Sequence, residues 1–403
     1  MLQTTMNDHA LSGFRVLDLA TPIGTYCPKL LADLGADVIK IEPPEGDPSR
    51  RIGPFKEDIP HHERSLYFLN FNTNKRGITL NLQTPDGKEL FQSLVRKADI
   101  VVETFNPGYL RSLGLDYTHL SQINPKLILT SITPFGQTGP YKEYGEADIV
   151  GFAMGGLMSM SGEADGPPCT APDNQAYMMT GVHAAAATLM ALWGRELHGS
   201  GQQIDVSMFE VLAAISSGQL TRYTLEGEVS QRTGSHSDAT PGDNYPCKDG
   251  HVRISIFTIR NWKNFVEWIG NPPELLDPKF DFPKMRQMNM EYIDRFVEEF
   301  TKTRTKAELY ESGQKMQVPV TPVSTPEEFF SNSHTIAREF FVSAEHPEIG
   351  TFRLPGAPYK LSETPWRVYR PAPLLGEHNV EIYQGELELS LEDLVILKGN
   401  GVI

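Results

Sequence analysis

The chain has 403 residues, more than one compact core usually holds, which favours two lobes over one. Its formal net charge of -15 repels nucleic acids and anionic lipid surfaces, so no nucleic-acid partner is expected. The hydrophobic fraction of 39% is that of a folded globular protein. The three cysteines are widely spaced and show no metal-type pattern, so they fit a reducing cytosol and predict no metal site.

Membrane attachment is not expected either. No apolar run reaches the roughly 20 residues that a membrane-spanning helix needs, and the longest, VHAAAATLMALW, is predicted to be a buried helix. The amino-terminal segment lacks the basic stretch and apolar core of a secretory signal. We therefore expect a cytoplasmic protein.

Apolar runs and helical patterns alternate along the first third of the chain. Helices are predicted between strands, at KLLADLG (29–35) and TPDGKELFQSLVRKA (84–98). This alternation favours a parallel sheet with right-handed crossovers, and therefore an α/β fold. The predicted strands are FRVLDLA (14–20), ADVIKIE (36–42), KRGITLNL (75–82), DIVVETF (99–105) and KLILTSITPFG (126–136).

The later part of the chain changes character twice. After a glycine-rich stretch, a long helix is expected at about 176–198, then a strand and a helix within GSGQQIDVSMFEVLAA. Next come a hairpin around KDGHVRISIF and short helices, and finally strands with proline-rich loops and a helix around SLEDLVILKG. The predicted segments are 1–218 for the first part of a large lobe, 219–318 for a smaller α+β domain, and 319–403 for a return linker and the rest of the large lobe.

Several strings, in order and over nearly the whole chain, resemble the class III CoA-transferases, the CaiB/BaiF family. They are LGADVIKIEPPEGDPSR, LNFNTNKRGITLNLQTPDGKELF, ADIVVETFNPG, SITPFGQTGPY, GRELHGSGQQIDVSMFE, VPVTPVSTPEEFF and APLLGEHN. The resemblance implies a ring-shaped chain with a Rossmann-like large lobe and a small lobe, and two such chains threaded into an interlocked dimer. It also implies that coenzyme A or acyl-CoA is a substrate, with no tightly bound cofactor.

The reaction implied by the family moves CoA from an acyl-CoA to a free carboxylic acid through an enzyme aspartate. Here the matching segment reads AYMMTGVHAAAATLMAL, and alignment on Gly181 puts Tyr177 at the aspartate position. A phenol has no carbonyl carbon on which to hold CoA, so the nucleophile is missing. Asp173, four residues earlier, is the nearest acid; a turn or N-cap role is expected for it, with a shifted nucleophile as the alternative.

The resemblance also implies contacts to CoA in the large lobe. By position, the adenine side would involve Leu80, Thr104 and Phe105, while Arg111 adjoins Ser112, the position of a phosphate-binding arginine in the family. Two interpretations are open for each of four further basic residues. Each would either contact a phosphate of CoA or belong only to a turn or loop: Lys75, Arg76, Arg50 and Arg51.

Three functions fit these residues. The first is a non-catalytic subunit, inactive alone, whose aspartate-bearing paralogue completes an interlocked heterodimer or a larger assembly. Heteromeric members such as the succinyl-CoA:benzylsuccinate enzyme of anaerobic toluene degradation are the model for it. The second is a self-sufficient homodimeric CoA-transferase that uses Asp173. The third is a CoA-binding or scaffold protein without turnover.

Overall fold

The computed structural model describes residues 9–145, 147–236 and 239–403, so part of the amino-terminal segment discussed above lies outside the described residues. The chain divides into two compact units, which are described separately. The larger consists of the described parts of Met1–Leu157, Ala171–Glu228 and Ala337–Ile403, and the smaller of those of Met158–Thr170 and Val229–Ile336. The sequence placed the changes of lobe after residues 218 and 318; the units change after 228 and 336, and 158–170 also belongs to the smaller one.

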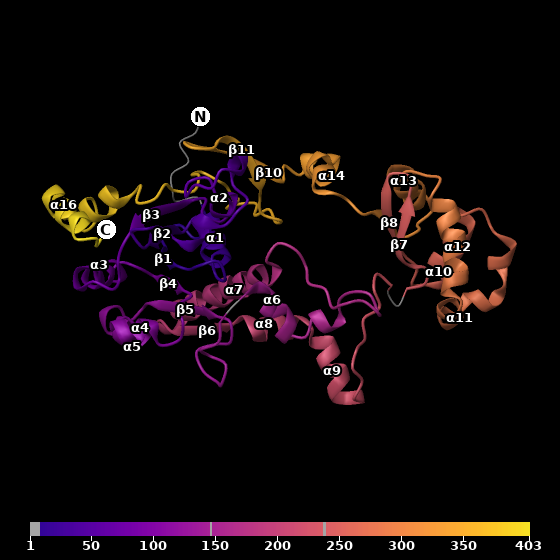
Figure 1. Cartoon of the computed structure of the whole chain (residues 1–403), viewed down its shortest axis with the longest axis horizontal. Coiled ribbons are helices and arrows are strands. Elements are labelled where there is room, and N and C mark those ends of the chain that lie inside the picture. The colour runs from indigo at the N-terminus through magenta and orange to yellow at the C-terminus, as the bar shows by residue number, and fades with distance from the viewer. Residues whose placement is uncertain (1–8, 146, 237–238) are drawn as a thin grey trace. The chain divides into compact units, whose positions relative to one another are not determined.

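A parallel six-stranded sheet forms the centre of the larger unit (Figure 1). Its order is β3-β2-β1-β4-β5-β6, and every neighbouring pair is parallel. This confirms the predicted α/β class and gives the strand order of a Rossmann fold. The strands are β1 (Arg15–Leu19), β2 (Asp37–Glu42), β3 (Lys75–Thr79), β4 (Ile100–Glu103), β5 (Ile128–Thr133) and β6 (Gln203–Ser207).

Helices cover both faces of this sheet. On one face, α3 and α5 pack with the carboxyl-terminal segment around a large apolar core. On the other face, the long helix α7 lies against α1, β5 and β6 (Figure 1). The helices of this unit are α1 (Tyr26–Asp33), α2 (Leu66–Phe71), α3 (Pro85–Val95), α4 (Tyr109–Leu113), α5 (Tyr117–Ile123), α6 (Asp148–Met154), α7 (Gln175–His198), α8 (Met208–Ile215), α9 (Ser217–Glu226) and α16 (Leu391–Gly399), and the hairpin is β10 (Phe341–His346) with β11 (Gly350–Pro355).

The two sheet faces differ in chemistry. Because side chains alternate along a strand, Leu17 and Leu19 of β1 point into the apolar core with Ile39 and Ile41 of β2. Asp18, between the two leucines, points to the opposite face and is fully buried. The face beneath α1 and α7 therefore carries buried charges, which bear on several of the predicted site residues.

The smaller unit is built on a three-stranded antiparallel sheet of order β7-β8-β9. Its first two strands form the hairpin that the sequence predicts, and Trp262, Phe265 and Leu309 are among the residues of its core. No helix among the described residues of the chain is long and apolar enough to cross a membrane. The elements are β7 (Gly242–Cys247), β8 (Gly250–Ser255), β9 (Val320–Pro322), α10 (Ile259–Trp268), α11 (Pro283–Met288), α12 (Met290–Thr301), α13 (Lys306–Lys315), α14 (Pro326–Ser331) and α15 (Ser333–Ala337).

Candidate functional site

A cavity of about 340 Å³ lies at the carboxyl ends of β1, β2, β3 and β4. In an open parallel sheet this edge is where ligands bind, and the strand order reverses here between β1 and β4. The wall is largely apolar and includes two residues predicted to contact CoA, Leu80 and Phe105. The Phe105 ring stacks at a tilt on Tyr109, with 4.8 Å between centroids, so an aromatic surface borders the cavity.

Thr104 holds together the two loops that follow β1 and β4. Its hydroxyl accepts a hydrogen bond from the Thr21 backbone N–H at 2.9 Å and shares another with the Thr21 hydroxyl at 2.7 Å. Thr21 lines the cavity while Thr104 does not. Thr104 thus lies beside the cavity wall and fixes a residue that forms it.

Lys75 is placed within the sheet, away from solvent. Its ammonium group is 2.8 Å from the Asp18 carboxylate and 2.9 Å from the Asn72 side-chain oxygen, and the side chain is fully buried. Burial lowers the pKa of Lys75, against the opposing effect of Asp18. Lys40 shares the same carboxylate at 3.8 Å and also pairs with Asp47 at 2.9 Å.

The other basic candidates are also engaged in ion pairs or hydrogen bonds. Arg76 lies near the amino ends of the strands, opposite the cavity, where it pairs with Asp37, Glu381 and Glu386. Arg50 is buried at 1% exposure and bonds to Glu42 and Glu63. Arg51 is exposed and donates to the Glu45 carbonyl oxygen at 3.1 Å.

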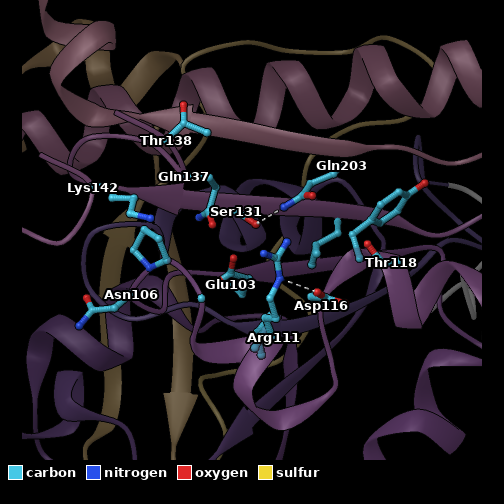
Figure 2. A pocket seen from close by; sticks show the side chains of 15 residues that line it. Glu103, Asn106, Arg111, Asp116, Thr118, Ser131, Gln137, Thr138, Lys142 and Gln203 are labelled. Atoms are coloured by element: carbon cyan, nitrogen blue, oxygen red, sulfur yellow. Dashed lines mark hydrogen bonds and ion pairs between the residues drawn. The ribbon is translucent and has the colours of Figure 1, made fainter. Parts of the chain in front are cut away.

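Arg111 lines a second cavity, of about 460 Å³, that shares no lining residue with the first. Figure 2 shows its guanidinium extending between Glu103 and Asp116 toward Ser131 and Gln203. The Arg111 Nε donates to the Asp116 carboxylate at 3.0 Å, and 79% of the side chain is exposed. Arg111 therefore lines a different cavity from Leu80 and Phe105.

Glu103 is the buried acid of this second cavity. It ends β4, and one of its oxygens accepts the Phe105 backbone N–H at 2.7 Å. Burial raises the pKa of Glu103 to about 7; a hydrogen bond from Ser131 opposes the rise and the negative charge of Asp205 adds to it. Sequence reasoning missed this residue, because a strand-terminal glutamate carries no sign of its burial.

Tyr177 lies in the first turn of α7 and is 8% exposed. Its backbone N–H donates to the Asp148 carboxylate at 3.0 Å, so Asp148 caps the start of α7 in place of Asn174, which makes no side-chain cap bond. Burial raises the pKa of Asp148, and bonds from the helix N–H groups oppose that rise. Asp148 is a residue that sequence reasoning missed, since it lies 29 positions from its partner.

Asp173 and Asn174 precede α7 in the left-handed conformation, with φ of 63° and 54°. Asp173 is exposed and stands outside the helix, in keeping with a turn residue. At the first turn of α7 the carboxylate that accepts the Tyr177 backbone N–H is that of Asp148.

Gly181 explains why α7 approaches α1 so closely. A Cβ at this position would lie 2.7 Å from the Tyr26 Cβ and 3.2 Å from the Cys27 backbone nitrogen. Only glycine fits this crossing without a shift of one helix. Gly181 is therefore a fixed packing point, and the residue four positions before it is Tyr177.

Comparisons with known proteins agree with this architecture. The chain matches the model of CoA-transferase family III over residues 11–379. It is 38% identical over 382 residues to the succinyl-CoA:(R)-benzylsuccinate CoA-transferase subunit BbsE of Thauera aromatica, covering 92% of this chain and 93% of that protein. It is 37% identical to a formyl-CoA:oxalate CoA-transferase of Streptomyces avermitilis, covering 98% of this chain and 99% of the relative.

The solved structures give the same result. A CaiB/BaiF family protein from Brucella suis superposes with a TM-score of 0.85 at 32% identity, over 94% of this chain and 99% of that one. Among the described residues, no group of three or more histidine, cysteine, aspartate or glutamate side chains is placed to hold a metal ion. The strand order, the family match over residues 11–379 and the similarity to these relatives together show that the chain belongs to CoA-transferase family III.

Proposed function

We propose that this chain is the non-catalytic subunit of a heteromeric CoA-transferase whose aspartate is supplied by a paralogous partner. The observation that carries the proposal is Tyr177, four residues before the packing glycine Gly181. Transfer requires an enzyme carboxylate to attack the thioester carbonyl, which releases CoA thiolate and leaves a mixed anhydride. The thiolate then attacks the enzyme carbonyl, which releases the acid. A phenol can be acylated but offers no carbonyl for that second attack.

Binding of CoA is a separate part of the proposal. The cavity of about 340 Å³ suits the adenine end of CoA, with Leu80 and Phe105 in its wall and Thr104 behind it. An adenine ring would pack on the Phe105 surface. Lys75 and Arg76 are left out of this proposed site, because both are committed to ion pairs elsewhere in the sheet.

The substrate and the assembly are proposed from one relative. The name of the Thauera protein gives a succinyl-CoA donor, a benzylsuccinate acceptor and the word subunit. We assign the same donor, and an acid such as benzylsuccinate, to the complex of this chain with its partner. The assembly would be an interlocked heterodimer or a multiple of it, located in the cytoplasm and serving the anaerobic breakdown of aromatic compounds.

The proposal is tested by CoA transfer from succinyl-CoA to benzylsuccinate and to a panel of other dicarboxylic and aromatic acids. The chain is assayed alone and co-expressed with an aspartate-bearing paralogue. We expect turnover only in the mixture, lost when the paralogue's aspartate is replaced by alanine. Tyr177→Phe and Asp173→Asn in this chain should each retain the activity of the mixture.

Turnover by the purified chain alone would contradict the proposal. In that case Asp173→Asn tests whether the chain is a self-sufficient enzyme that uses Asp173 as its nucleophile. Such an enzyme would lose its activity when this exposed acid is replaced. CoA binding without turnover in any mixture would instead indicate the scaffold function.

A further inference from the structure

The second cavity, lined by Arg111 and Glu103, has the make-up of a site for a small charged molecule. Its polar lining comes from several strands, helices and loops of the larger unit, with Ser131 on β5 and Gln203 on β6 facing Arg111 in the middle of α4 (Figure 2). The Gln203 amide nitrogen donates to the Ser131 hydroxyl at 3.4 Å. With a volume of about 460 Å³, the cavity is within the range of small-molecule sites.

Two cationic groups reach this cavity. The Arg111 Nε is bonded to Asp116, while its two terminal nitrogens make no further hydrogen bond among the described residues. Lys142, on the loop after β5, also lines the cavity and is 3.9 Å from Glu143. A guanidinium with two terminal donors pointing into a cavity matches the two oxygens of one carboxylate.

The negative groups limit the charge of the ligand. Asp116 lies beside Arg111, and Asp205 stands behind Gln137, whose backbone N–H it binds. A phosphate dianion placed at Arg111 would face Asp116 and Glu103, with the charge of Asp205 behind the wall. A single carboxylate carries less charge, and it pairs favourably with the protonated form of Glu103, which then donates an O–H.

We propose that this cavity binds the carboxylate of a small organic acid, held between the Arg111 guanidinium and the Glu103 carboxyl. The body of the acid would lie on the apolar part of the lining, which includes Leu110 and Leu129. This cavity is distinct from the one at Leu80 and Phe105. The proposal therefore does not depend on whether this chain binds CoA in that other cavity.

The pairing with Glu103 makes binding depend on pH. Burial raises the pKa of Glu103 to about 7, so the protonated form prevails below that pH and is lost above it. From pH 6 to pH 8 the dissociation constant should therefore rise about tenfold. The charged or titratable groups near Glu103 are Arg111, Asp116, Tyr117, Lys142 and Asp205.

The test is titration calorimetry on the full chain with benzoate, succinate, inorganic phosphate and CoA at constant ionic strength. We expect benzoate and succinate to bind, and Arg111→Ala to weaken both by about tenfold or more. Arg96→Ala, which removes the same charge from an exposed position on another helix end, should leave the affinity unchanged. Glu103→Gln should bind with little dependence on pH.

Three results would overturn the proposal. The first is that neither acid binds, or that both bind equally well to Arg111→Ala. The second is phosphate or CoA binding that depends on Arg111 more strongly than the acids do, which would assign the cavity to a phosphate group. The third is an unchanged pH dependence in Glu103→Gln, which would remove Glu103 from the site.

Discussion

Asp18→Ala is expected to lower the free energy of unfolding of the larger unit by about 3–5 kcal/mol. Asp18 is fully buried and is the carboxylate partner of Lys75 at 2.8 Å, with Lys40 at 3.8 Å. Its removal leaves the Lys75 ammonium without a counter-charge in the sheet. Chemical denaturation, followed by circular dichroism, measures the loss.

The matched control is the double variant Asp18→Ala/Lys75→Met. Removing both charges avoids an isolated buried ammonium, so the double variant should be more stable than Asp18→Ala alone. Asp18→Asn keeps an acceptor for the Ala20 backbone N–H, which Asp18 binds at 2.9 Å, and should fall between wild type and Asp18→Ala. Equal denaturation midpoints for Asp18→Ala and wild type would show that the buried pair contributes little.

Glu103→Gln is expected to change how stability depends on pH. The folded pKa of Glu103, about 7, is above the ordinary value for glutamate because burial disfavours the charged form. Ionisation of Glu103 therefore lowers the free energy of unfolding of the wild type. This loss is absent at pH 4 and grows as the pH rises toward 8. Relative to wild type, Glu103→Gln should gain about 3 kcal/mol of unfolding free energy between pH 4 and pH 8.

The control for this effect is Glu89→Gln, at an exposed position on α3, which should show no such gain. Denaturation midpoints at pH 4, 6 and 8 are sufficient. If Glu103→Gln and wild type lose or gain stability in parallel over this range, Glu103 is not titrating near pH 7 in the folded protein.

Most of the sheet was predictable because β1, β2, β4 and β5 are buried on both faces, so each appears as a short, mainly apolar run. The predicted strand at 36–42 corresponds to β2 at Asp37–Glu42, and the predicted helix at 176–198 corresponds to α7 at Gln175–His198. Both patterns are local, so neighbouring residues suffice to recognise them.

The buried charges were not predictable in the same way. Lys75 and Arg76 are adjacent in a charged run that looks solvent-exposed, yet Lys75 is buried because its partner, Asp18, lies 57 residues away. Arg76 points to the amino edge of the sheet, and only strand register assigns it there. Pairings over such distances in the chain leave no local pattern.

The domain boundaries show a related difference. The sequence placed the glycine-rich stretch within the first lobe, because it stands between two elements of that lobe. The structure assigns 158–170 to the smaller unit, with Arg232 donating to the carbonyl oxygens of Glu163 and Gly166. A short segment whose carbonyl oxygens accept hydrogen bonds from a residue more than 60 positions away leaves no signal in the local composition.

The position of the enzyme thioester tests the central claim most directly. The co-expressed complex is incubated with succinyl-CoA alone, and each subunit is weighed by intact mass spectrometry. We expect a CoA adduct on the aspartate-bearing partner and none on this chain, where Tyr177 lies four residues before Gly181. A CoA adduct on this chain, mapped to a peptide that contains Asp173, would contradict it.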